Sequence, residues 1–379
     1  MASILRRLPW PGRAWKPLTF SSANFKRIPV DEKVGEEMFP DYKASRYYSV
    51  RIGEVLRDRY QIVGKLGFGT TSTVWLARDL NGRRHVALKL FITSQAMGQQ
   101  LDNELTMYKR ISSFSTAHPG RGAIRGLLDS FDVTGPDGSH RCLVHPPLWE
   151  SIITFLDRNP VRRLPAPVLA IVLLRLFQAL DFLHTECKVI HTGLDDRTIY
   201  PSRELEKPKK VGAPVLCDFG SAVVGDVEHT EDVQPDIYRA PEVILEAPWS
   251  YQIDIWNAGC MVWDLFEGGH LFTGHDPEHR RYRSRAHLFE IIALLGQPPK
   301  ALLELGQSSQ KFFTDEGQFR AKIPLPDSKS LEEIETSLEG QSREKFLAMM
   351  RKMLQWEPSK RASARVLAED QWIREQLGL

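Results

Sequence analysis

Two glycines near residue 70 and a lysine about twenty residues later have the types and spacing needed to bind phosphate groups. Gly67 and Gly69 lie between two β-rich runs, and glycine lets backbone amides approach a phosphate closely. Lys89 ends the apolar run that begins at Val86, and Glu104 follows in a helical segment, where it can pair with the lysine ammonium group. A glycine pair in a hairpin is common by itself. The three elements in this order predict a phosphate-binding site.

A second candidate site ends another apolar run. The sequence predicts a strand over residues 215–220 that ends in Asp218-Phe219-Gly220. Ala240-Pro241-Glu242 follows after an intervening segment. The carboxylate of Asp218 would coordinate Mg²⁺ between two phosphates, because hard oxygen ligands suit that cation. The alternative is an ordinary turn aspartate. The pairing of the two motifs favours the metal site.

The elements that must position these residues fall into two groups. Short β-rich runs with glycine turns predict an antiparallel sheet, with strands over 60–65, 73–79, 85–91, 127–133 and 141–144 and one helix over 101–111. Later segments predict helices over 148–156, 167–185, 254–268, 286–295, 343–354 and 362–377. The predicted fold class is α+β and bilobed, with a small sheet lobe over 57–147 and a larger helical lobe over 148–379.

Composition excludes some classes of protein and leaves the N-terminus open. The formal net charge of +2 over 379 residues carries no field typical of a nucleic-acid binder, and we expect neither nucleic-acid binding nor a membrane span. Residues 1–56 are expected to form a basic, partly flexible extension. Because the first thirty residues are basic, a mitochondrial transit peptide is the alternative to a cytoplasmic or nuclear location. A monomer is expected.

The order of these motifs from Tyr60 to about Trp372 resembles the eukaryotic protein kinases. More narrowly, Tyr47 to Gly53, Ser72 to Asp79 and His191-Thr192 look like the fungal branch of the SR-protein kinases. This resemblance implies the bilobed protein-kinase fold, ATP and Mg²⁺ as cofactors, and phosphorylation of serines in arginine-serine-rich splicing factors.

The same resemblance assigns roles to particular positions. Asp218 would hold the metal, Glu242 would pair with Arg361, and Asp254 would begin the helix that supports the catalytic loop. The connection after His145 would bond adenine through the main chain near Leu148. The residues implied for ATP binding are Leu66, Gly67, Gly69, Val74, Ala87, Lys89, Glu104 and Leu148.

The chain departs from the family at the catalytic loop, where no catalytic residue is intact. In the family, His-Thr is followed by an aspartate, then by a lysine two residues later and an asparagine three residues after that. Here, after His191, the chain has Gly193, Asp195 and Thr198 at those positions. A positioned general base contributes roughly a hundredfold to ten-thousandfold, so we expect impaired turnover. A displaced Asp195 or Asp196 is not expected to substitute, since about 1 Å of misplacement costs roughly a hundredfold.

Three functions remain open. The chain is an inactive serine/threonine kinase that still binds ATP, or a pseudokinase scaffold that docks arginine-serine-rich proteins or another kinase. Alternatively, it is an active kinase whose catalytic-loop segment is missing from this sequence after Thr192, because residues 196–205 resemble a stretch that lies farther downstream in fungal relatives. A single deletion explains the loss of three neighbouring residues more simply than three substitutions.

Overall fold

The protein is described by a computed structural model that covers residues 14–21, 28–29, 31–97, 100–148, 151–193, 212–320 and 330–379. Its chain divides into two compact units. Unit 1 comprises the described residues within Met1–Leu105 and Gly126–Trp149. Unit 2 comprises those within Thr106–Arg125, Glu150–Thr198 and Lys210–Leu379. Residues of the predicted extension therefore belong to unit 1 together with the sheet.

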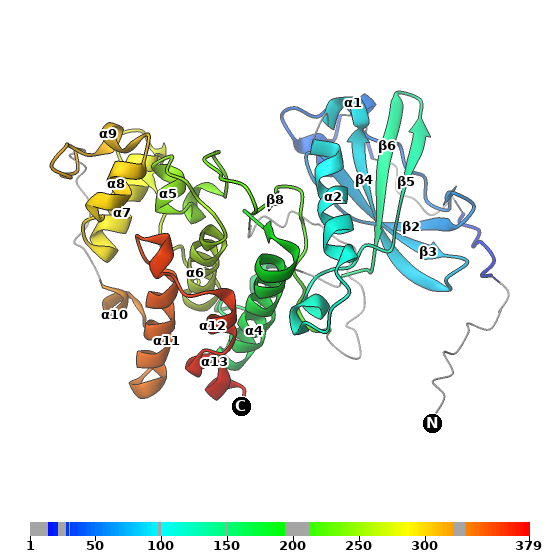
Figure 1. The fold of residues 1–379 in the computed structure, drawn as a ribbon. Coiled ribbons are helices and arrows are strands. Elements are labelled where there is room, and N and C mark those ends of the chain that lie inside the picture. Colours follow the sequence, from blue (N-terminus) through cyan, green and yellow to red (C-terminus); the bar gives the residue numbers. More distant parts are fainter. Residues whose placement is uncertain are drawn as a thin grey trace. The chain divides into compact units, whose positions relative to one another are not determined.

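Unit 1 is built on a six-stranded antiparallel sheet with the order β1-β2-β3-β4-β6-β5 (Figure 1). The predicted antiparallel sheet is thereby confirmed. Helix α2 lies beside the sheet and carries Glu104. The elements are η2 (Gly35–Met38), η3 (Ala44–Arg46), β1 (Val55–Leu56), β2 (Tyr60–Phe68), β3 (Ser72–Asp79), β4 (Arg84–Thr93), α1 (Ser94–Met97), α2 (Gln100–Ser113, whose later turns lie in unit 2), β5 (Asp129–Gly135) and β6 (Gly138–His145).

The two faces of this sheet follow from the alternation of side chains along its strands. In β4, Val86, Leu88 and Leu90 point to one face, while Ala87 and Lys89 point to the other. The first face buries a hydrophobic core of residues Leu56, Tyr60, Ile62, Ala77, Val86, Leu88, Leu90, Phe131, Cys142 and Val144. The opposite face of the strand carries Ala87 and Lys89.

The extension packs against the sheet. Tyr48, Val50 and Ile52 lie against the hydrophobic core of unit 1. Farther toward the N-terminus, the Gln61 side chain exchanges two hydrogen bonds of 2.8 Å with the backbone of Leu18. These described parts of the extension are held by specific contacts.

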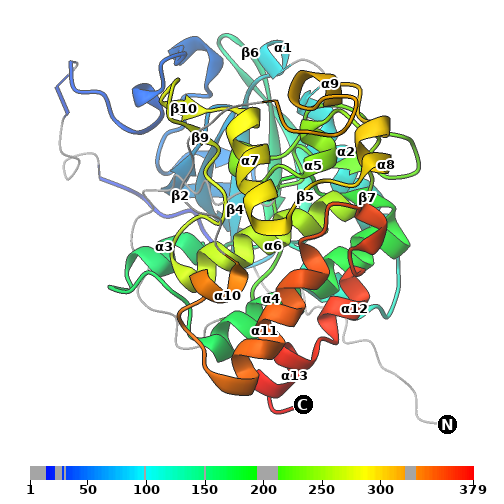
Figure 2. The same cartoon turned by 90° about the vertical axis from the view of Figure 1, so that its left-hand side faces the viewer.

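Unit 2 is mainly helical (Figure 2). Helix α4 packs against α6, α12 and α13. The helical elements are η4 (Pro119–Ala123), α3 (Ile152–Asp157), α4 (Ala166–Phe182), η5 (Leu183–Cys187), η6 (Asp236–Tyr238), α5 (Pro241–Ile244), α6 (Gln252–Glu267), α7 (Ser284–Leu295), α8 (Lys300–Leu305), α9 (Ser309–Phe312), α10 (Leu331–Ile334), α11 (Gly340–Met353), η7 (Pro358–Lys360), α12 (Ala364–Ala368) and α13 (Gln371–Gln376). Two short antiparallel pairs join β7 (Val189–Ile190) to β8 (Val223–Val224) and β9 (His275–Asp276) to β10 (Arg281–Tyr282).

The most apolar helix of the described chain is central to unit 2. The stretch Ala166–Cys187, which joins α4 to the π-helical turn η5, is long and apolar enough to cross a membrane by length and composition. More than half of its most apolar window, 56%, is buried inside the structure, and no side chain of Leu173, Phe177 or Leu180 is exposed. This burial is typical of a core helix.

Two predicted elements differ from the structure. The predicted strand 215–220 is wrong: Leu216 forms only an isolated parallel bridge with Ile124, because no longer partner strand lies beside it among the described residues. The predicted helix 362–377 is divided into α12 and α13. Asp370 causes this break, since its carboxylate accepts a hydrogen bond of 2.9 Å from the amide of Trp372 and caps the second helix.

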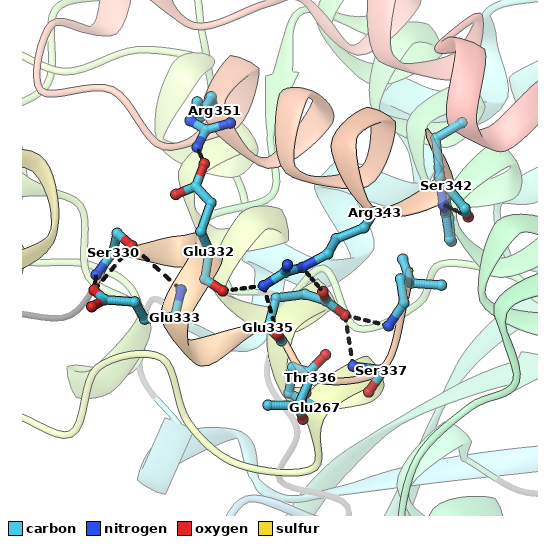
Figure 3. A network of polar contacts seen from close by, with 12 residues as sticks. Glu267, Ser330, Glu332, Glu333, Glu335, Thr336, Ser337, Ser342, Arg343 and Arg351 are labelled. Carbon is cyan, nitrogen blue, oxygen red and sulfur yellow. Dashed lines mark hydrogen bonds and ion pairs between the residues drawn. The ribbon is translucent and has the colours of Figure 1, made fainter. Parts of the chain in front are cut away.

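A polar network ties α10 and α11 together (Figure 3). The buried carboxylate of Glu335 accepts a hydrogen bond from Nε of Arg343 at 2.8 Å and from the amides of Ser337 and Leu338, both at 2.7 Å. Glu332 of α10 pairs with Arg351 of α11. Since a buried charge is tolerated only when it is paired and hydrogen-bonded, this network fixes the turn that precedes α11.

Candidate functional site

The predicted phosphate-binding glycines lie at the tip of the hairpin formed by β2 and β3. The amide of Gly69 donates to the carbonyl of Ser72 at 2.7 Å and closes the turn. A register shift between Lys65 and Gly67 interrupts the ladder just before the tip. A Cβ atom at Gly69 would meet only ordinary contacts, so the hairpin by itself does not require glycine there. A ligand close to the backbone would require it.

The strands bring four of the residues implied for ATP binding to one face of unit 1. Val74 is paired with Lys89 across β3 and β4, and Gly67 is paired with Val74 across β2 and β3. Residues paired across antiparallel strands share a face, and Ala87 shares it with Lys89 because the two are separated by one residue. Of the remaining three, Leu66 and Leu148 are half-buried, and Glu104 lies on α2. This face lies opposite the hydrophobic core.

The predicted ion pair is present within unit 1. Nζ of Lys89 lies 2.7 Å from Oε2 of Glu104, and the two side chains are only 17% and 4% exposed. The carboxylate thus fixes the position of the ammonium group in a partly desolvated setting, where charge interactions are stronger than in water. The arrangement fits a lysine that holds the anionic oxygens of a phosphate chain.

In unit 2, the start of the catalytic loop is held by Asp254. This fully buried carboxylate, in the first turn of α6, accepts hydrogen bonds from the amides of His191 at 2.8 Å and Thr192 at 2.9 Å. His184 contributes a third contact, 2.9 Å from its Nε2. The predicted support of the catalytic loop by the helix that contains Asp254 is therefore confirmed.

The residue that follows this anchored dipeptide is Gly193. Its Cβ position is open, with no heavy atom of another described residue within 4 Å, and its φ lies outside the left-handed region. The backbone therefore offers room for a side chain that the chain does not have. Asp195 and Thr198, at the two other altered positions, lie outside the described residues.

Asp218 lies in a turn that aromatic packing holds in place. The ring of Phe219 is buried between Tyr108 and His191, with centroid separations of 5.1 Å and 5.2 Å. Nε2 of His191 donates to the carbonyl of Cys217 at 3.1 Å. Asp218 itself adopts a φ of +68°, an uncommon conformation for a residue other than glycine. Its carboxylate oxygens suit Mg²⁺.

Sequence reasoning missed two side chains around these motifs. Thr192 donates its hydroxyl to the carbonyl of Ser221 at 2.7 Å and so ties the catalytic loop to the residue after Gly220. Tyr47 in the extension contacts the tip of the glycine hairpin. No spacing rule signals either contact, since each joins residues more than twenty positions apart.

Comparisons with known proteins agree with this arrangement. A family model described as "Protein kinase domain" matches residues 60–373. The chain belongs to the protein kinase family. A serine/threonine protein kinase of Aspergillus fumigatus is 40% identical over 399 aligned positions that cover 98% of each chain. The kinase also resembles the serine/threonine-protein kinase SRPK of Physarum polycephalum, with 30% identity over 87% of this chain and 89% of that protein.

A more distant relative is also a kinase. The protein kinase dsk1 of Schizosaccharomyces pombe is 24% identical over 90% of this chain and 86% of its own length. The kinase is thus a serine/threonine kinase of the SR-protein kinase type. Kinases of this family bind ATP and Mg²⁺, and Lys89 and Asp218 have the donor chemistry that these cofactors need.

Proposed function

We propose that this chain is a nucleotide-binding kinase of the SR-protein kinase type whose phosphoryl transfer is strongly impaired. The observation that carries the proposal is the contrast between two sites. The Lys89–Glu104 pair is formed at 2.7 Å, whereas Gly193 follows the anchored His191-Thr192 with no side chain at the position of the catalytic base. The proposal therefore keeps ATP binding and removes efficient phosphoryl transfer.

The size of the expected defect follows from the roles of the altered positions. A positioned general base contributes roughly a hundredfold to ten-thousandfold to a rate. The asparagine position at Thr198 and the lysine position at Asp195 add to the loss, because phosphoryl transfer depends on metal ions and cations around the γ-phosphate. Turnover far below that of an intact relative is the expected result.

Arginine-serine-rich proteins are the proposed partners. Relatives from mouse and human are named SRSF protein kinase 3, which associates this branch with splicing factors. In unit 2, the described segment before Ala240 exposes several carboxylates, among them Glu231 and Asp232, whose side chains are 66% and 73% exposed. A basic peptide is attracted to such a segment by charge. A second kinase remains the alternative partner for a scaffold.

Thermal unfolding with and without Mg²⁺-ATP tests nucleotide binding. A ligand that binds only the native state at a hundred times its dissociation constant stabilises the protein by about 2.7 kcal/mol, so Tm should rise clearly. Lys89→Met should abolish most of the rise, since it removes the ammonium group that meets the phosphates. Unchanged Tm in the wild-type protein would instead support a nucleotide-free scaffold.

Phosphate transfer to an arginine-serine peptide tests the impairment. Under the proposal, the purified protein transfers phosphate at least about a hundredfold more slowly than an SR-protein kinase with an intact loop, consistent with the loss of the base. A rate comparable to that of the intact kinase would refute the proposal, because it would require a base that this chain lacks at residue 193.

A specific observation favours a second candidate, an active kinase whose loop segment is absent from this sequence. The alignment with the Aspergillus kinase spans 399 positions, more than the 379 residues of this chain, so the relative has residues that this chain lacks. Sequencing the transcript across the codons for Thr192 and Gly193 decides between the two. An inserted segment that begins with aspartate makes the protein an active kinase, whereas a transcript that matches this sequence supports a genuine deletion.

A further inference from the structure

A short segment of the extension reaches the tip of the glycine hairpin within unit 1. We call residues 35–48, which contain η2 and η3, the strap. Three of its side chains contact the hairpin: Glu36 pairs with Lys65, Phe39 packs edge-on against Phe68 with 5.8 Å between ring centroids, and Tyr47 contacts the backbone of the tip. The strap thus meets both the strand and the turn.

The contact of Tyr47 is directed at the backbone. Its hydroxyl donates to the carbonyl of Thr70 at 2.9 Å, and the carbonyl of Gly69 lies 3.3 Å from the same oxygen. In a trans peptide the carbonyl and the following amide point in opposite directions. Holding these two carbonyls toward the strap therefore directs the amides of Thr70 and Thr71 away from it.

The direction away from the strap is the side of the sheet that carries Lys89. The strap contacts Lys65, whose Nζ lies 5.6 Å from the ring centroid of Trp75. Trp75 packs against the hydrophobic core, and it alternates along β3 with Val74, which is the cross-strand partner of Lys89. The amides at the tip are thereby presented on the face of the lysine.

The strap also packs against the side chain of Phe68, which lies beside the hairpin tip. Phe68 is only 8% exposed although it lies beside the hairpin turn, and a Cβ atom at Gly35 would lie 3.5 Å from its ring. Gly35 has a φ of +65°, a conformation that favours glycine. The packing of Phe39 on Phe68 and the Glu36–Lys65 pair anchor the strap beside the contact made by Tyr47.

We propose that the strap holds the glycine hairpin in the geometry that covers the nucleotide phosphates, with Tyr47 as the positioning residue. This inference rests on the proposed nucleotide binding by the same hairpin. It implies that Tyr47 affects affinity only through the phosphate groups, because its described hydrogen bonds are with the hairpin tip rather than with the residues near Leu148.

The test compares Tyr47→Phe with Tyr42→Phe in the full chain. The Tyr42 ring packs 5.2 Å from that of Tyr47, but its hydroxyl makes no hydrogen bond with a described residue, so this variant is a matched control. Dissociation constants for Mg²⁺-ATP, Mg²⁺-ADP and adenosine are measured by calorimetry. Loss of one hydroxyl hydrogen bond should raise the dissociation constants of ATP and ADP about threefold to tenfold and leave that of adenosine unchanged.

Two results would overturn the inference. If Tyr47→Phe weakened the binding of adenosine as much as that of ATP, the effect would be a general loss of structure. If the affinities for ATP and ADP were unchanged, the contact of Tyr47 would not position the tip. The melting temperature of each variant identifies any global effect. Tyr42→Phe should match the wild-type protein for all three ligands.

Hydrogen exchange separates this inference from the proposed function. In the nucleotide-free protein, Tyr47→Phe should raise the exchange of amides in residues 67–73 at least about threefold and leave β4 unchanged, because the strap then releases the hairpin tip. If the wild-type protein binds no nucleotide, the proposed function has failed, and exchange alone judges whether the strap orders the hairpin. Identical exchange of residues 67–73 in the wild-type protein and in Tyr47→Phe would show that the strap does not order the hairpin.

Discussion

At the scale of single residues, the proposed function depends most on Gly193, which occupies the position expected for the catalytic base. The two residues before it are held by Asp254 as a catalytic loop requires, and the open space at its Cβ position accepts a side chain. Under the proposed function, the missing side chain at this position is what limits phosphoryl transfer. Placing an aspartate at residue 193 tests this explanation.

Gly193→Asp should increase phosphate transfer. A carboxylate directly after Thr192 supplies the missing base, and an increase of about tenfold or more is expected, below the full contribution of roughly a hundredfold because the altered positions at Asp195 and Thr198 remain. The initial rate of transfer from labelled ATP to an arginine-serine peptide measures it.

Gly193→Asn is the matched control for that experiment. It adds a side chain of nearly the same size without a group that accepts a proton at neutral pH. If Gly193→Asp were no faster than Gly193→Asn, the base would not be what limits the rate, and the missing-segment explanation would gain weight.

At the scale of elements, a buried ion pair joins α5 to the chain just after η7. Both oxygens of Glu242 accept hydrogen bonds from the guanidinium group of Arg361, at 2.6 Å and 2.7 Å, and neither side chain is exposed. The guanidinium group also lies 5.0 Å from the ring centroid of Trp256. The predicted pair is thus confirmed, and it links segments 119 residues apart.

Glu242→Gln should lower the free energy of unfolding by about 3 kcal/mol or more, because it leaves the charge of Arg361 buried without compensation. Urea unfolding of the purified protein measures the change. In the exposed pair Lys300–Glu304 of α8, Glu304→Gln should cost less than about 0.5 kcal/mol. Equal costs for the two variants would contradict the role assigned to burial.

Local patterns predicted the longer helices and strands, but not the short ones and not every limit. Strands β2, β3 and β4 appear where short β-rich runs bounded by glycine turns predicted them. The strand expected at 215–220 failed because strand formation needs a neighbour, and Leu216 finds only Ile124 among the described residues. A local pattern contains no information about such a neighbour.

At the scale of the whole molecule, the buried His287 makes stability depend on pH. Burial lowers its pKa to about 3, and the charge of Arg239 adds to this effect. Its Nδ1 lies 3.1 Å from the hydroxyl of Tyr282. An unfolded histidine has a pKa of about 6.5, so below that pH the unfolded chain binds a proton that the folded protein does not.

The free energy of unfolding should therefore fall as pH drops from about 6.5 toward 3, by about 2 kcal/mol from this group between pH 7.5 and pH 5. His287→Leu should remove that part of the slope in urea unfolding at the two pH values. His275→Asn, at an exposed position, is the control and should keep the wild-type slope. An unchanged slope in His287→Leu would contradict the expectation.

Residue identity and short spacing were enough to predict the order of the motifs, the family, and the antiparallel strands that flank the two glycines and carry Lys89. They were also enough to locate the position after Thr192 where the family's aspartate is replaced by Gly193. Each of these features is local, because it depends on residues that are close together in the chain or on the order in which short motifs occur.

Contacts between distant segments emerged only from the folded chain. The packing of the extension on the sheet and the hydrogen bond from Tyr47 to Thr70 belong to this group. So do the two amide hydrogen bonds through which Asp254 provides the loop support that the family resemblance implied. The physical reason is separation along the chain: Asp254 lies more than sixty residues from the amides it binds, and Tyr47 lies 23 residues from Thr70. Buried polar groups must find partners wherever packing brings them, and no local pattern specifies which partners those are.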